Sequence, residues 1–205
     1  MFRHVEFYPG DPILGLMEKY NQDPRSEKVN LGVGVYYDGE GRLPVLECVK
    51  TVERALAESP RPRGYLPMEG LAAYRSACQN LLFGADHPAV KEGRIATIQS
   101  LGGSGALRVG ADFIHAWFPQ AKCYVSDPTW GNHIGIFEGA GFEVGKYPYY
   151  DPATIGVKFE EMKAFFRTLK QHDVVVLHPC CHNPTGVDLS RSQWDEILQI
   201  VKEVG

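Results

Sequence analysis

From residue 95 onward, short apolar runs alternate with amphipathic stretches of helical period, and this alternation constrains the fold more than any other feature. Apolar runs predict strands at 95–99, 122–126, 142–147 and 173–178. The last run, with Val-Val-Val-Leu at its centre, lacks polar alternation, as is typical of a strand buried on both faces of a parallel sheet. Strands that alternate with helices indicate an α/β fold.

The same periodicity predicts helices along the whole chain, and Ser190–Gln193 forms a capping box that opens the last one. Residues 1–12 mix aromatic residues with prolines and have no period, so they predict an extended arm. Residues 29–37 predict a strand or an extended loop, and residues 38–41 predict a turn. The predicted helices cover 13–20, 45–57, 70–82, 105–117, 132–138, 159–170 and the stretch after Ser190.

The composition of the chain excludes several classes of protein. A length of 205 residues accommodates one complete hydrophobic core and a little more. Hydrophobic residues make up 44% and charged residues 22%, which excludes a disordered tail or a coiled-coil rod. The net charge of −4 gives no electrostatic footprint for nucleic acid or for an anionic membrane.

The cysteines point to a reducing compartment. There are five, scattered without a disulfide framework. The first six residues lack the apolar core of a signal peptide, and no run approaches 18 apolar residues. We expect a soluble, cytoplasmic protein without a membrane segment.

Three motifs follow three different predicted strands, at the edge where open α/β sheets bind ligands. The first, Gly102–Gly105, precedes a helix, where free N–H groups and the helix dipole favour an anion such as a phosphate. A tight strand-to-helix turn without a ligand is the alternative for this motif. The second motif, Ser126–Trp130, carries a tryptophan that either stacks on a planar ligand or caps the sheet core.

The third motif, His178–Gly186, contains two histidines and two cysteines. We predict no metal site, because adjacent cysteines cannot easily both reach one tetrahedral zinc and no CxxC spacing is present. Its complexity after a core strand favours a functional loop. We expect cis peptide bonds at Asn183–Pro184 and Asp127–Pro128, which would aim side chains at a common ligand.

Together these motifs resemble the fold-type I aminotransferases that use pyridoxal 5′-phosphate (PLP), and specifically the aspartate/aromatic aminotransferase subgroup. The resemblance runs from about residue 2 to residue 205. The matching stretches are 29–36 (VNLGVGVY), 65–70 (YLPMEG), 102–107 (GGSGAL), 126–130 (SDPTW) with His133, and 178–186 (HPCCHNPTG).

The resemblance implies a set of cofactor contacts. Gly103 and Ser104 would hold the PLP phosphate, and Trp130 would stack on the pyridine ring with His133 beneath it. Asn183 would donate to the phenolic oxygen of the ring and help orient the substrate carboxylate, supported by His178. Tyr65 would reach the phosphate of the partner in a homodimer.

The resemblance also implies substrate contacts, a fold and a division into domains. Gly34 would bring its backbone to the substrate, and Ile13, Leu14 and Val33 would form an apolar lid. The fold would be a three-layer α/β/α, mostly parallel sheet: an incomplete PLP-transferase large domain with an N-terminal arm and part of a small domain. The domains would be the arm at 1–12, a small-domain segment at 13–43 and the N-terminal part of the large domain at 44–205.

The sequence departs from the family pattern where the catalytic groups belong. None of the ten lysines lies in the Ser-x-Ser-Lys context of the family's Schiff-base lysine. The Asp on the pyridine nitrogen, the Tyr on the phenolic oxygen and the Arg residues on the phosphate and the substrate carboxylate also lack counterparts. The resemblance thus implies an N-terminal fragment of a chain about twice as long, inactive alone, and no catalytic residue can be assigned.

The expected activity of the complete chain is transfer of an amino group from acidic or aromatic L-amino acids to 2-oxoglutarate, with amino acids and 2-oxo acids as substrates. Whether aspartate or aromatic donors are preferred stays open. One alternative is a dinucleotide-binding, Rossmann-type oxidoreductase, although Arg108 stands where the third glycine of that motif belongs. A non-catalytic fragment or binding module is the other.

Overall fold

The structure, a computed structural model, describes residues 3–5, 12–30, 32 and 34–205, without the side chains of 12–14. Val33 and most of the predicted arm at 1–12 lie outside the described residues. The chain divides into two compact units, Met1–Gly64 and Tyr65–Gly205. The predicted domain boundaries at 12 and 43 remain predictions.

The first unit contains two helices, α1 (Pro12–Gln22) and α2 (Glu47–Glu58), both close to their predicted bounds. The predicted turn is present, since the Gly41 N–H donates to the Asp38 carbonyl at 3.0 Å. The described residues of 29–37 form no strand, so the loop alternative applies to them.

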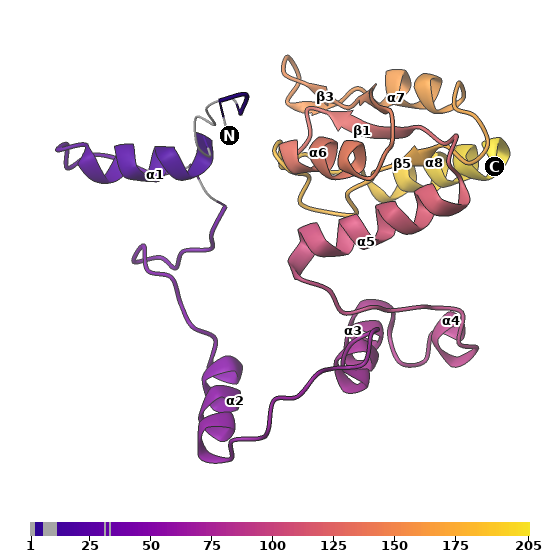
Figure 1. The fold of residues 1–205 in the computed structure, drawn as a ribbon. Coiled ribbons are helices and arrows are strands. Elements are labelled where there is room, and N and C mark those ends of the chain that lie inside the picture. Colours follow the sequence, from indigo (N-terminus) through magenta and orange to yellow (C-terminus); the bar gives the residue numbers. More distant parts are fainter. Residues whose placement is uncertain (1–2, 6–11, 31, 33) are drawn as a thin grey trace. The chain divides into compact units, whose positions relative to one another are not determined.

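The second unit is built around a parallel sheet (Figure 1). The strand order is β2-β1-β5, and Cys123 in β1 pairs with Val144 in β2 on one side and with Val174 in β5 on the other. A short antiparallel pair, β3 with β4, follows β2. The bounds are α3 (Ala72–Phe83), α4 (Pro88–Lys91), α5 (Gly102–Trp117), β1 (Cys123–Asp127), α6 (Gly131–Gly139), β2 (Val144–Pro148), β3 (Tyr150–Asp151), β4 (Gly156–Val157), α7 (Phe159–Phe166), β5 (Val174–Val175) and α8 (Arg191–Val204).

Two hydrophobic clusters, one on each face of the sheet, make this unit a three-layer α/β/α arrangement. Cys123 and Val125 of β1 belong to a cluster that includes residues of α5 and α6. Tyr124, between them in sequence, packs against the other cluster, which includes residues of α7 and α8. Since successive side chains of a strand point to opposite faces, the two helix pairs cover opposite faces. The predicted fold class is confirmed.

The strand predicted at 95–99 is wrong, because this segment pairs with no strand. Its polar groups bond elsewhere: the Gln99 N–H donates to the Glu69 carbonyl at 3.0 Å, and the Gln79 side-chain amide donates to the Ile95 carbonyl at 2.9 Å. A run of apolar residues therefore forms a loop here, without a neighbouring strand.

Two further predicted elements are shorter than expected. α7 ends at Phe166 rather than at residue 170, and β5 covers only two residues of the predicted 173–178. The carboxylate of Asp173 accepts the backbone N–H groups of Lys170 and Lys122, at 3.0 and 3.1 Å. These bonds hold the turn after α7 and join it to the start of β1, so the helix cannot continue into it.

Candidate functional site

The three sequence motifs meet the sheet at one edge. β1 ends at Asp127, and the loop after β5 contains residues 178–186, so both follow the carboxyl ends of parallel strands. α5 packs on the sheet through Ala111 and is joined by the short segment 118–122 to the start of β1. It therefore runs antiparallel to β1, and its N-terminus faces the same edge, where open α/β sheets bind ligands. Asp127–Pro128 and Asn183–Pro184 are both cis, as expected.

The N-terminus of α5 presents free backbone donors. Its N-cap residue, Leu101, makes no side-chain capping bond, and the Gly105 N–H donates to the Leu101 carbonyl at 3.2 Å. The N–H groups of Gly103 and Ser104 precede that bond and have no carbonyl of their own helix to reach. Together with the exposed Ser104 side chain they suit an anion.

Trp130 and His133 lie at the start of α6, directly after β1. Trp130 is half-buried, and its ring meets the His133 ring edge-on, with centroids 5.3 Å apart and planes at 89°. His133 is 6% exposed, and its Nδ1 lies 2.8 Å from the Thr129 hydroxyl. Burial, together with the neighbouring His178, lowers the pKa of His133, so the imidazole is neutral at pH 7.

His178 and Asn183 lie at the two ends of one tight turn. The Asn183 backbone N–H donates to His178 Nδ1 at 3.1 Å. His178 therefore accepts at Nδ1, and its own proton sits on Nε2. Burial lowers the pKa of His178, and Asp188 opposes that shift. The Asn183 side chain is exposed, and it hydrogen-bonds to nothing within the part of the chain that the structure describes.

Sequence reasoning assigned no role to His182, yet it is the most enclosed residue of the loop. Its ring is 2% exposed and stacks on Tyr149, with centroids 4.0 Å apart and planes at 16°. Its Nε2 lies 2.8 Å from the Ser126 hydroxyl, and its Nδ1 lies 2.8 Å from the Thr185 hydroxyl. Burial and the neighbouring His178 lower its pKa to about 4.

Asp188 is a second residue that sequence reasoning missed. Its carboxylate accepts the backbone N–H groups of Cys181 and His182, each at 2.8 Å. These bonds lower the pKa of Asp188. The only sequence signal was an acidic residue two positions after a loop-ending glycine.

The remaining predicted site residues are Tyr65 in the second unit and Gly34, Ile13, Leu14 and Val33 in the sequence of the first. Tyr65, at the start of the second unit, is fully exposed, and Gly34 is exposed in the first unit. Ile13 and Leu14 are described only as helix backbone, and Val33 lies outside the described residues. In the described part of the chain, no three His, Cys, Asp or Glu side chains are arranged to hold a metal ion.

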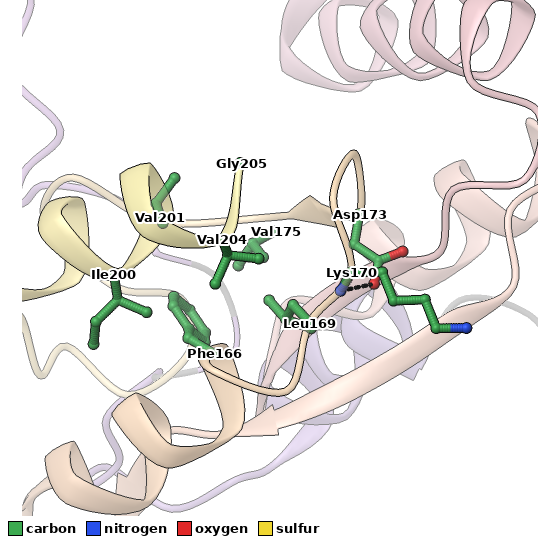
Figure 2. Close-up of a pocket in the computed structure, with 9 residues that line it drawn as sticks. All are labelled: Phe166, Leu169, Lys170, Asp173, Val175, Ile200, Val201, Val204 and Gly205. Atoms are coloured by element: carbon green, nitrogen blue, oxygen red, sulfur yellow. Dashed lines mark hydrogen bonds between the residues drawn. The ribbon is translucent and has the colours of Figure 1, made fainter.

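One cavity of the second unit lies away from these residues. It has a volume of about 50 Å³ and sits at the start of β5, where Phe166, Val175 and Ile200 line it (Figure 2). The bond from the Lys170 N–H to Asp173 closes one side of it. Because the histidines follow the other end of β5, this cavity is not part of their site.

Comparison with known proteins identifies the family and the fold. The family model for aminotransferase class I and II matches residues 26–205. The tyrosine aminotransferase of Klebsiella pneumoniae is 56% identical over 203 residues, which is 98% of this chain and 51% of that protein.

Two solved structures have the same fold over the whole chain. The psychrophilic aromatic amino acid aminotransferase from Psychrobacter sp. B6, cocrystallised with aspartic acid, is 63% identical with a TM-score of 0.96. The aromatic-amino-acid aminotransferase from Burkholderia pseudomallei, covalently bound to pyridoxal phosphate, is 51% identical with a TM-score of 0.95. The chain covers 51% of each of them.

The chain thus spans about half the length of the relatives it matches. The described residues contain no helix with the length and hydrophobicity needed to cross a bilayer. A match over most of the chain displaces the dinucleotide-binding alternative, and we conclude that this chain belongs to the aminotransferase class I and II family.

Proposed function

We propose that this chain is the N-terminal part of a PLP-dependent enzyme that transfers amino groups from acidic and aromatic L-amino acids to 2-oxoglutarate. The observation that carries the proposal is the convergence of three groups at one sheet edge: the free N–H groups at the start of α5, the ring of Trp130 and the side chain of Asn183. The relatives named above support the substrates, since they include a tyrosine aminotransferase and an enzyme cocrystallised with aspartic acid.

The residues present suit PLP. A phosphate needs convergent donors, which Gly103 and Ser104 offer at the positive end of the α5 dipole. A planar pyridine ring needs a flat face, which the half-buried Trp130 can offer. The phenolic oxygen of the ring needs a donor, and the Asn183 carboxamide makes no hydrogen bond to other described residues.

When bound, PLP supplies an electron sink for the bond that breaks at the substrate α-carbon. This chain binds and orients it. Trp130 would fix the tilt of the ring, and Asn183 would align both the ring and the substrate carboxylate. His133 and His178, both kept neutral by burial, would support that edge without adding charge.

The groups that move protons would lie elsewhere in the complete enzyme. Lys146 is the lysine paired with the end of β1, and its ammonium lies 3.1 Å from the Asp127 carboxylate in an exposed ion pair. None of the ten lysines lies in the Ser-x-Ser-Lys context that the resemblance expects of the lysine that holds the cofactor. We therefore propose that the catalytic lysine and the aspartate at the pyridine nitrogen lie outside residues 1–205.

The remaining proposals rest on the family resemblance. The complete enzyme would be a homodimer in which Tyr65 reaches the phosphate of the partner, and Gly34, Ile13, Leu14 and Val33 would close over the substrate. The domains would divide at 12 and 43 as predicted. All five cysteines are free thiols, which favours the cytoplasm.

Steady-state assays of the complete protein test this function. We expect 2-oxoglutarate-dependent turnover with aspartate, tyrosine and phenylalanine. Absence of turnover with tyrosine and phenylalanine would remove the aromatic half of the proposal. Absence of turnover with every donor, together with no binding of PLP, would remove the whole.

Residues 1–205 alone should not transaminate. Borohydride reduction in the presence of PLP, followed by peptide mapping, should label no lysine stoichiometrically. One fully labelled lysine together with turnover would place the catalytic lysine inside this chain.

A further inference from the structure

His182 precedes Asn183, the residue proposed to contact the cofactor, and its ring lies within hydrogen-bond distance of two hydroxyl groups. Its Nε2 meets the hydroxyl of Ser126 in β1, and its Nδ1 meets the hydroxyl of Thr185, two residues beyond Asn183. One imidazole thus connects the end of a core strand to the far side of the loop.

The backbone groups around His182 are also hydrogen-bonded. The carboxylate of Asp188 holds the N–H groups of Cys181 and His182, and the Gly186 N–H donates to the His182 carbonyl at 2.7 Å. The Asn183 N–H is taken by His178. Among the described residues of this loop, the Asn183 carboxamide is therefore left free while the groups around it are bonded.

The ring of His182 also has a fixed plane. Tyr149 stacks on it, and the Tyr149 hydroxyl donates to the Val187 carbonyl at 2.6 Å. His178 packs beside it with ring centroids 4.6 Å apart. Two hydroxyls and two aromatic neighbours therefore restrict rotation of the ring and tie the loop to the end of β1.

We propose that His182 is a positioning residue: by bridging Ser126 and Thr185 it aims the side chain of Asn183 at the cofactor ring. This inference rests on the proposed function. His182 itself touches neither cofactor nor substrate, and it acts through the placement of Asn183. A displacement of about 1 Å in such a contact costs up to about 100-fold in rate.

The test is a double-mutant cycle in the complete, PLP-loaded enzyme. His182→Phe keeps a ring on Tyr149 and removes both hydrogen bonds. We expect it to lower kcat about 10- to 100-fold and to weaken PLP binding, measured by spectrophotometric titration of the apoenzyme. In an Asn183→Ala background the same substitution should cause little further loss, because residues that act as one unit are not additive.

Two more variants separate positioning from folding. Ser126→Ala removes only one of the two hydrogen bonds of His182, so it should lower kcat and PLP affinity less than His182→Phe does. It serves as the test if His182→Phe does not fold. His182→Gln, which retains a donor and an acceptor, should recover part of the activity. As a matched control, His172→Asn alters an exposed histidine that stacks on Phe118 and should leave kcat and PLP affinity unchanged.

Equal losses from His182→Phe with and without Asn183 would overturn this inference while leaving the proposed function intact. So would unchanged kcat and PLP affinity in both His182→Phe and Ser126→Ala. If Asn183→Ala itself changes neither PLP binding nor turnover, the proposed role of Asn183 fails, and the role of His182 fails with it.

Discussion

The helices of this chain fall into two groups that look alike in sequence and differ in packing. α2 and α3 contain no buried residue, whereas α7 buries Met162 and Phe166, and α8 buries Ile197 and Ile200. All four are amphipathic and were predicted from the same periodicity. The difference shows that periodicity predicts a helix, whereas burial requires a partner surface, which the sheet supplies to α7 and α8.

The helix starts give a second contrast. α8, which follows the loop of residues 178–186, begins with a full capping box at Ser190. α5 and α6, at the site, begin at Leu101 and Trp130 without a side-chain cap. A side-chain cap would occupy the N–H groups that an anion needs, so the uncapped start of α5 suits binding while the capped start of α8 suits stability.

The largest expected effect on stability comes from truncating a core residue in one of the buried helices. Phe166→Ala, at 1% exposure, should lower the free energy of unfolding by about 3–5 kcal/mol. The matched change in α2, Val52→Ala at 56% exposure, should stay within about 0.5 kcal/mol. Urea unfolding of both variants measures the difference, and equal losses would show that α2 also packs into a core.

A smaller effect concerns how the free energy of unfolding depends on pH through the histidines of the site. His182 has a folded pKa of about 4 against 6.5 for the free side chain, so the unfolded chain binds more protons between these values. Stability should therefore fall as pH decreases from 6.5 to 4, by roughly 3 kcal/mol at about 1.4 kcal/mol per unit. His178 and His133 shift in the same direction, whereas Asp188 works against the shift of His182.

Unfolding curves across that pH range check this expectation. His182→Gln should flatten the pH dependence. A wild-type stability that stays constant from pH 6.5 to 4 would mean that His182 becomes protonated in the folded protein without cost.

The smallest effect sharpens the contrast between helix starts. Ser190→Ala removes the capping box of α8 and should cost about 1 kcal/mol. Leu46→Ala, at the uncapped start of α2, removes no capping bond and should leave helix stability nearly unchanged. Thermal melts followed by circular dichroism compare the two, and a larger loss at Leu46 would reverse the expected order.

Local sequence was enough to predict the helices and the Ser190 cap, because each depends on neighbouring residues. The alternation of apolar runs with helices predicted the parallel sheet, although not which runs pair. It could not predict that 95–99 lacks a strand partner, since pairing depends on residues far away in sequence. The role of His182 was missed for the same reason. Its bond to Ser126 joins positions 56 residues apart.

The central claim, that the edge carrying Trp130 is the cofactor site, is tested most directly by the PLP dissociation constant of the complete protein with two tryptophan variants. Trp130→Ala should weaken binding by about 1–3 kcal/mol, roughly 5- to 150-fold, on the scale of aromatic–base stacking. Trp117→Ala, at an exposed position in α5, should leave the constant unchanged. An unchanged constant in Trp130→Ala, or an equal loss in both variants, would contradict the claim.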